Sequence, residues 1–257
     1  MENWHPEVLA TIADRLGIAF TDLTPPRSRS FRTEVGPNIH VLDWGGQGPA
    51  VLLHGGSITA RTWDYVAIGL RADFRLIALD MRGHGASDWA NDYSIESYAT
   101  DLMAVVDGLG IERTHIVGMS LGGMVACEFA LRHPDRTESL AMVDVTSRPV
   151  FAATARMRTF MTDFRGAATV DEVVEMALAV SPKSDPELNR EVLALDARSA
   201  AWPRAQVYVR SSSPARLGHG SGLGNLPVGV GALLHERPGI RWRVWSVPDI
   251  SLPPLLE

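Results

Sequence analysis

The segment that most constrains the fold lies near the middle of the chain, where an apolar run, a turn and a helical run follow one another. Ile116 and Val117 form the β-branched apolar run, and Gly118-Met119-Ser120-Leu121-Gly122 forms the turn. The residues after the turn are apolar at helical spacing, namely Met124, Val125, Phe129 and Leu131. Because the reversal is so sharp, a Cβ at Gly118 or Gly122 is expected to collide with a neighbouring strand or helix. The sequence therefore predicts a strand, a tight turn and a helix, with Ser120 at the apex.

The pattern Gly-x-Ser-x-Gly between a strand and a helix is the nucleophile elbow. Such a turn lifts the serine Oγ clear of the sheet, at the positive end of a helix, where an oxyanion can be stabilised. The five-residue pattern alone also occurs by chance as a glycine-bounded turn. The interpretation therefore depends on the strand and helix around it and on matching signals upstream.

The first 146 residues alternate between strand-like and helix-like patterns. Helices are expected at residues 6–17, 61–71 and 94–109, and strands at residues 30–35, 39–44, 50–53, 74–79 and 140–145. Alternation of this kind implies a parallel sheet with helices on both faces. We therefore expect an α/β fold with a mostly parallel sheet.

Residues 147–200 show helical patterns without a strand signal, with one helix expected at residues 171–180 and another opening at Pro186. We interpret this stretch as a helical lid inserted over the carboxyl edge of the sheet. The remaining divisions are an N-terminal helix and connector at residues 1–28 and a core made of residues 29–146 and 201–257. After about residue 200 glycines are frequent and acidic residues sparse, and only residues 239–247 resemble a strand.

Composition narrows the class of protein. A hydrophobic content of 46% is ample for a core, and a net charge of −6 without a basic run argues against nucleic-acid and anionic-membrane partners. No signal peptide or bilayer-spanning run is recognisable, so we expect a cytoplasmic protein. No Gly-x-Gly-x-x-Gly motif follows the first strand, and neither a P-loop nor a metal-ligand spacing occurs, so we expect no cofactor and no metal.

The order of three motifs resembles the α/β-hydrolase fold family. These motifs are His54-Gly55-Gly56 after the third strand, Asp80-Met81-Arg82-Gly83-His84-Gly85 after the fourth, and the elbow itself. The resemblance covers about residues 30–200 and is greatest to bacterial members with a helical lid, which include esterases, enol-lactonases and carbon–carbon bond hydrolases. A serine nucleophile argues against the epoxide hydrolase and haloalkane dehalogenase branches, which need a carboxylate there.

The resemblance implies a role for each matching residue. Ser120 would be the nucleophile, and the backbone N–H groups of Leu121 and Gly56 would stabilise the oxyanion. His54 would brace its loop. The family order of serine, acid and histidine makes Asp249 the candidate acid, with Asp144 as the fallback.

The base is the open question. The family histidine lies beyond the acid, whereas His219 and His235 both precede Asp249. His235 is the candidate base, since Asp144 and His235 would keep the family order. Either the last strand and helix are lost, or the reading frame shifts after the lid.

The expected function is hydrolysis of a small-molecule carboxylic ester, with carbon–carbon bond or enol-lactone hydrolysis as one alternative and an impaired, histidine-lacking relative as another. The sequence does not indicate an oligomeric state.

Overall fold

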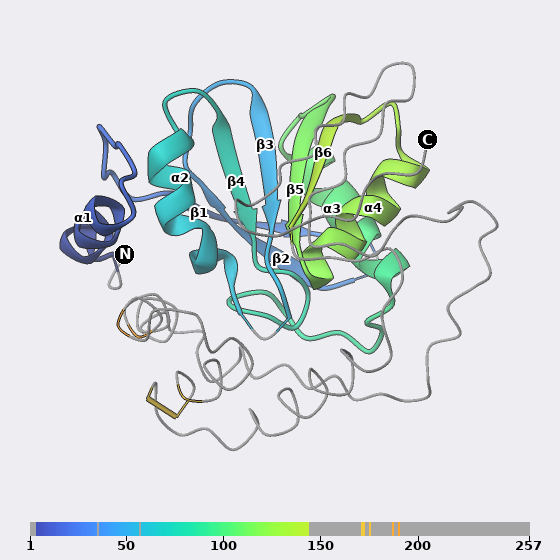
Figure 1. Ribbon diagram of the computed structural model, residues 1–257. Helices are drawn as coiled ribbons and strands as arrows, with labels where there is room; N and C mark the ends of the chain where they lie inside the picture. Colours follow the sequence, from blue (N-terminus) through green and yellow to red (C-terminus); the bar gives the residue numbers. More distant parts are fainter. Residues whose placement is uncertain are drawn as a thin grey trace, which may run out of the picture.

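The computed structural model describes residues 4–34, 36–56 and 58–143, together with Asp171, Glu172, Glu175, Glu187 and Arg190. Its helices are α1 (Pro6–Arg15), the 3₁₀ helix η1 (Ala60–Trp63), α2 (Asp64–Leu70), α3 (Ile95–Gly108) and α4 (Leu121–Arg132). Its strands are β1 (Arg27–Arg32), β2 (Asn38–Asp43), β3 (Pro49–Leu53), β4 (Arg75–Leu79), β5 (Thr114–Met119) and β6 (Thr137–Val143). Figure 1 shows how these elements are arranged.

The strands form one sheet in the order β1-β2-β4-β3-β5-β6. β4, β3, β5 and β6 run parallel, whereas β2 is antiparallel to both β1 and β4. The mostly parallel sheet is therefore confirmed, but the simple alternation rule is wrong for the first two strands. A short turn at Thr33–Pro37, with no crossover helix, joins β1 to β2, and such a connection can only make an antiparallel pair.

Helices cover both faces of the sheet, as expected (Figure 1). Alternate residues of β3 separate the two layers. Val51 and Leu53 pack with the core residues of α3 and α4, whereas Ala50 and Leu52 pack with those of α1 and α2. A strand that is buried on both faces needs an unbroken apolar sequence, which explains the continuous run at β3. Burial of each such large side chain contributes about 1.5–3 kcal/mol.

Some element boundaries differ from the expected ones. β1 starts at Arg27 because it pairs with β2 from Arg27 opposite Asp43, although its side chains are almost all exposed and give no apolar signal. The segment expected as one helix at residues 61–71 is divided into η1 and α2, and Thr59 caps η1 by accepting a hydrogen bond from Arg61 N–H. β6 begins at Thr137, which pairs with Thr114 of β5.

The five later residues are all helical and fall within the two helices expected for residues 147–200. Arg190 Nε donates to Asp171 Oδ1 at 2.7 Å. The lid itself and the three-part division of the chain stay predictions, and the strand expected at residues 239–247 lies outside the described residues. Within the described part of the chain, no helix has the length and apolar character needed to cross a membrane.

Candidate active site

Ser120 lies between β5 and α4, so the predicted strand, turn and helix with serine at the apex are confirmed. Its backbone has φ +50° and ψ −114°, and among the described residues it is the one non-glycine residue with a positive φ. Such a conformation costs of order 1–3 kcal/mol and persists only where the surroundings enforce it. Ser120 N–H donates to Val143 O at 2.9 Å, and Ser120 O accepts from Gly123 N–H at 3.0 Å.

The two elbow glycines meet the steric requirement predicted for them. A Cβ on Gly118 would lie 2.5 Å from the carbonyl carbon of Gly122 and 2.7 Å from Gly123 Cα. A Cβ on Gly122 would lie 2.6 Å from the carbonyl oxygen of His54. These neighbours are backbone atoms, which cannot rotate away, so the close approach of β5, α4 and the end of β3 requires glycine at both positions.

Ser120 is partly exposed and stands at the N-cap position of α4, but its Oγ makes no capping hydrogen bond to the helix. The hydroxyl therefore lies at the positive end of the helix dipole without being used to cap it. Gly122, Gly123 and Met124 N–H groups each have a backbone acceptor. Within the described part of the chain, the N–H of Leu121 has none, so it is available to an oxyanion.

The loop after β3 forms the other side of the site. Leu53 of β3 pairs with Gly118 of β5, so the carboxyl ends of these two strands meet. A Cβ on Gly55 would lie 3.5 Å from Ser120 Cβ, which shows how closely this loop approaches the elbow. Gly56 follows directly, is partly exposed, and its N–H has no acceptor among the described residues. The structure thus brings Ser120, Leu121 and Gly56 together at the carboxyl edge of the sheet.

The candidate acids Asp144 and Asp249 and the candidate base His235 all lie outside the described residues, and their roles stay predictions. His54 is buried, and both its ring nitrogens are engaged: Nδ1 donates to Gly55 O at 2.7 Å, and Nε2 accepts from Met81 N–H at 3.0 Å. Burial lowers the pKa of His54, so the ring is neutral near pH 7. These contacts fit the bracing role expected for His54 and leave it no free nitrogen to act as base.

His84 is also buried, and its ring lies edge-on to that of His54 with 4.7 Å between centroids. Burial, followed by the effect of the nearby His54, lowers the pKa of His84 to about 3. Its Nδ1 donates to Arg82 O at 3.1 Å. A neutral imidazole of such low basicity is a structural group of this turn.

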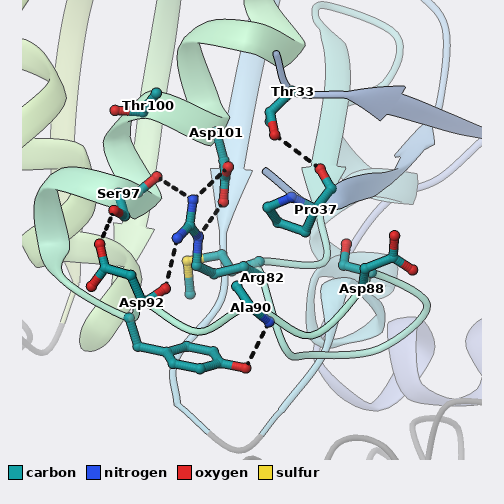
Figure 2. A network of polar contacts seen from close by, with 12 residues as sticks. Thr33, Pro37, Arg82, Asp88, Ala90, Asp92, Ser97, Thr100 and Asp101 are labelled. Atoms are coloured by element: carbon teal, nitrogen blue, oxygen red, sulfur yellow. Dashed lines mark hydrogen bonds and ion pairs between the residues drawn. The ribbon is translucent and has the colours of Figure 1, made fainter. Parts of the chain in front are cut away.

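Arg82 joins the same turn to α3 through partners that the sequence reasoning missed (Figure 2). Its guanidinium donates to both carboxylate oxygens of Asp101, at 2.6 and 2.8 Å, and to the carbonyl oxygens of Asp92 and Ser97. A signal for Asp101 was present: it is placed at i+3 from Tyr98 on the apolar face of α3, where a carboxylate requires a buried partner.

Comparisons with known proteins give the family. Residues 48–175 match the family model described as alpha/beta hydrolase fold. The chain belongs to the α/β-hydrolase fold family. The esterase Rv0045c of Mycobacterium tuberculosis is 38% identical over 142 residues, which cover 54% of this chain and 45% of the esterase. The pimeloyl-[acyl-carrier protein] methyl ester esterase of Vibrio vulnificus is 34% identical over 173 residues, 65% of each chain.

Solved structures of the α/β-hydrolase fold agree with this assignment. The esterase RhEst1 from Rhodococcus sp. ECU1013 superposes with a TM-score of 0.57 at 26% identity, over 70% of each chain. The matched region covers less than half the length of the Mycobacterium tuberculosis esterase. The family is therefore shown, whereas the activity of the whole protein is a proposal.

Proposed function

We propose that the chain carries the core of a serine hydrolase that cleaves a small carboxylic ester through an acyl-enzyme on Ser120. The observation that supports this most is the strained elbow, which presents a serine hydroxyl at a helix N-terminus beside two backbone N–H groups without described acceptors. The relatives named as esterases favour an ester over other acyl substrates.

In the proposed reaction, Ser120 Oγ attacks the ester carbonyl carbon and gives its proton to a base. The carbonyl oxygen becomes an oxyanion that accepts hydrogen bonds from Leu121 and Gly56 N–H. The C–O bond to the alcohol then breaks, the alcohol leaves with the proton, and an acyl-enzyme remains. Water hydrolyses it through a second oxyanion and releases the acid. Loss of one oxyanion donor typically lowers kcat by about 10²–10³-fold.

The base in this scheme is His235, oriented by Asp249 or by Asp144. The second candidate is an impaired hydrolase-like protein that lacks a catalytic base. His54 does not replace that base, because both its ring nitrogens are already engaged in hydrogen bonds. Enol-lactone or carbon–carbon bond hydrolysis would use the same elbow. A cytoplasmic location, the absence of nucleic-acid and membrane partners, and the absence of metal and cofactor stay predictions.

Intact mass after incubation with a fluorophosphonate tests the proposal, with Ser120→Ala as control. We expect one adduct per chain on the unmodified protein and none on Ser120→Ala. Peptide mapping must place the adduct on Ser120, because Ser28 and Ser139 also form 2.8 Å hydrogen bonds with imidazoles. Hydrolysis of p-nitrophenyl acetate should fall by about 10³-fold or more in Ser120→Ala. A folded protein that forms no adduct would instead support the impaired candidate.

The second step separates the candidate partners of Ser120. His235→Ala should lower both the rate of phosphonylation and ester hydrolysis if His235 is the base. Asp249→Asn and Asp144→Asn form a matched pair, of which only the true acid should reduce the rate. An unchanged rate in His235→Ala would exclude His235 and leave His219 as the remaining histidine after the lid.

A further inference from the structure

The segment from the end of β3 to the first residue of η1, residues 54–60, carries Gly56 and is here named the oxyanion loop. Both of its ends are anchored on the residues that follow β4. At the first end, His54 Nε2 accepts from Met81 N–H at 3.0 Å. At the second, Ala60 N–H donates to Asp80 Oδ1 at 2.7 Å. The position of the oxyanion loop beside Ser120 therefore depends on where Asp80 and Met81 lie.

Asp80 is buried, and its carboxylate holds together three separate segments. Oδ1 accepts from Ala60 of the oxyanion loop, and Oδ2 accepts from Ala86 N–H at 3.0 Å and from His40 Nδ1 at 2.8 Å. Burial by itself raises the pKa of Asp80, but the hydrogen bond and charge of His40 and the bond from Ala60 bring it below the ordinary value. A buried carboxylate is held in place only while such donors remain, because burying it unpaired is costly.

His40 comes from β2, which is antiparallel to the catalytic strands and contains none of the sequence motifs. Its ring joins two partners, since Nδ1 faces Asp80 and Nε2 lies 2.8 Å from Ser28 Oγ on β1. Its backbone is fixed as well: His40 N–H donates to Ser87 Oγ at 2.8 Å, and His40 O accepts from Asp80 N–H at 3.0 Å. The imidazole is thus rigidly placed against the carboxylate.

We infer that His40 and Asp80 are positioning residues for the oxyanion loop: their hydrogen bond keeps the Asp80 carboxylate where it fixes Ala60 and, through the loop, the N–H of Gly56. Neither residue touches the substrate. The inference rests on the proposed function in so far as Gly56 N–H stabilises the oxyanion. A donor that acts on the oxyanion stabilises the transition state more than the bound substrate, so its displacement lowers kcat and leaves KM nearly unchanged.

The test compares His40→Leu with His40→Asn, whose amide nitrogen can replace Nδ1 as a donor to Asp80. His115→Leu is the matched control. His115 on β5 forms an equally short hydrogen bond, 2.8 Å from its Nδ1 to Ser139 Oγ on β6, but has no described contact with the oxyanion loop. Ser28→Ala removes only the outer partner of His40. Thermal melts on all variants confirm that they are folded.

Two readouts are measured. In His40→Leu, hydrogen–deuterium exchange of the peptide that contains Ala60 should accelerate by about tenfold, because its amide loses a fixed acceptor. Ester hydrolysis should lose about tenfold to a hundredfold in kcat, with KM within about twofold. His40→Asn should return the exchange rate at Ala60 and kcat most of the way to the wild-type values. Ser28→Ala and His115→Leu should leave the exchange rate and kcat near the wild-type values.

The exchange experiment needs no activity, so the two proposals can fail separately. Unchanged exchange at Ala60 in folded His40→Leu would overturn the positioning role, as would equal effects in His115→Leu. Accelerated exchange in a protein that no fluorophosphonate labels would support the positioning role and reject the esterase. An adduct on Ser28 in the Ser120→Ala protein would also overturn the inference, because His40 would then serve Ser28 as a base.

Discussion

The buried pair of Arg82 and Asp101 allows a quantitative test of how the motif after β4 is held (Figure 2). The side chains of Arg82 and Asp101 are only 7% and 4% exposed, and they meet through two parallel hydrogen bonds of 2.6 and 2.8 Å. Asp101→Asn keeps the shape of the side chain but removes the negative charge. The guanidinium of Arg82 then stays buried without a counter-charge, which is the costly state of a broken buried ion pair.

The expected loss is about 3–5 kcal/mol of unfolding free energy. For a chain of this size each kcal/mol shifts Tm by about 2–4 °C, so Asp101→Asn should lower Tm by roughly 6–20 °C. Glu138→Gln is the matched control. Glu138 pairs with Arg113 at 3.2 Å, but both side chains are nearly half exposed, and such surface pairs contribute about 0–1 kcal/mol.

Scanning fluorimetry and urea unfolding at pH 7 measure both variants. A Tm loss in Asp101→Asn no larger than that in Glu138→Gln would refute the reasoning, because it would mean that the pair is not desolvated. The double variant Arg82→Met/Asp101→Leu adds a second check. It removes both charges and should recover part of the loss, but it should stay below wild type because Asp92 O and Ser97 O lose their donor.

Two further perturbations are expected to act in opposite directions. Asp64 is buried, and although Arg61 opposes it, burial raises the pKa of Asp64 from 3.8 to about 6. The folded state therefore keeps a proton that the unfolded chain loses between about pH 4 and 6, so wild-type stability falls as pH rises through this window. Asp64→Asn has no titrating group at this position and so lacks this loss. Its stability relative to wild type should improve by about 2 kcal/mol from pH 4 to pH 7 in thermal melts. A stability difference between the two proteins that stays constant with pH would contradict this. Gly118→Ala should destabilise by more than about 1–3 kcal/mol, because the new Cβ meets backbone atoms. Gly17→Ala is the comparison: Gly17 has a φ of +66° but open space around the added Cβ, so this variant should lose only the backbone penalty, about 1–2 kcal/mol, in the same urea titration.

The parts of the fold that could be predicted from the sequence are those encoded locally. The elbow is readable because glycine spacing, the β-branched pair and the helical periodicity all lie within one short segment. The burial of β3 on both faces is readable for the same reason, since four apolar residues stand in an unbroken run. Each of these features follows from neighbours in the chain.

The parts that could not be predicted depend on pairing between distant segments. β1 carries five exposed residues out of six, so its position follows from its register with β2 and not from an apolar pattern. The contact of His40 with Asp80 joins residues forty positions apart, and nothing in the sequence around His40 indicates its partner. Asp101 differs, because a carboxylate on an apolar helix face is a local signal for a buried cation.

The same distinction explains why one half of the candidate site is defined and the other is not. A nucleophile at an elbow and donors at a loop and helix terminus are backbone features, and backbone geometry imposes glycines at fixed spacings that a sequence reveals. An acid and a base need only a carboxylate and an imidazole at the correct place in space, which imposes no spacing on the residues around them. Asp144, Asp249 and His235 are therefore defined by family order alone. Exchange at Ala60 tests the backbone half of the site, and the rate of phosphonylation tests the side-chain half, so the two halves can be established independently.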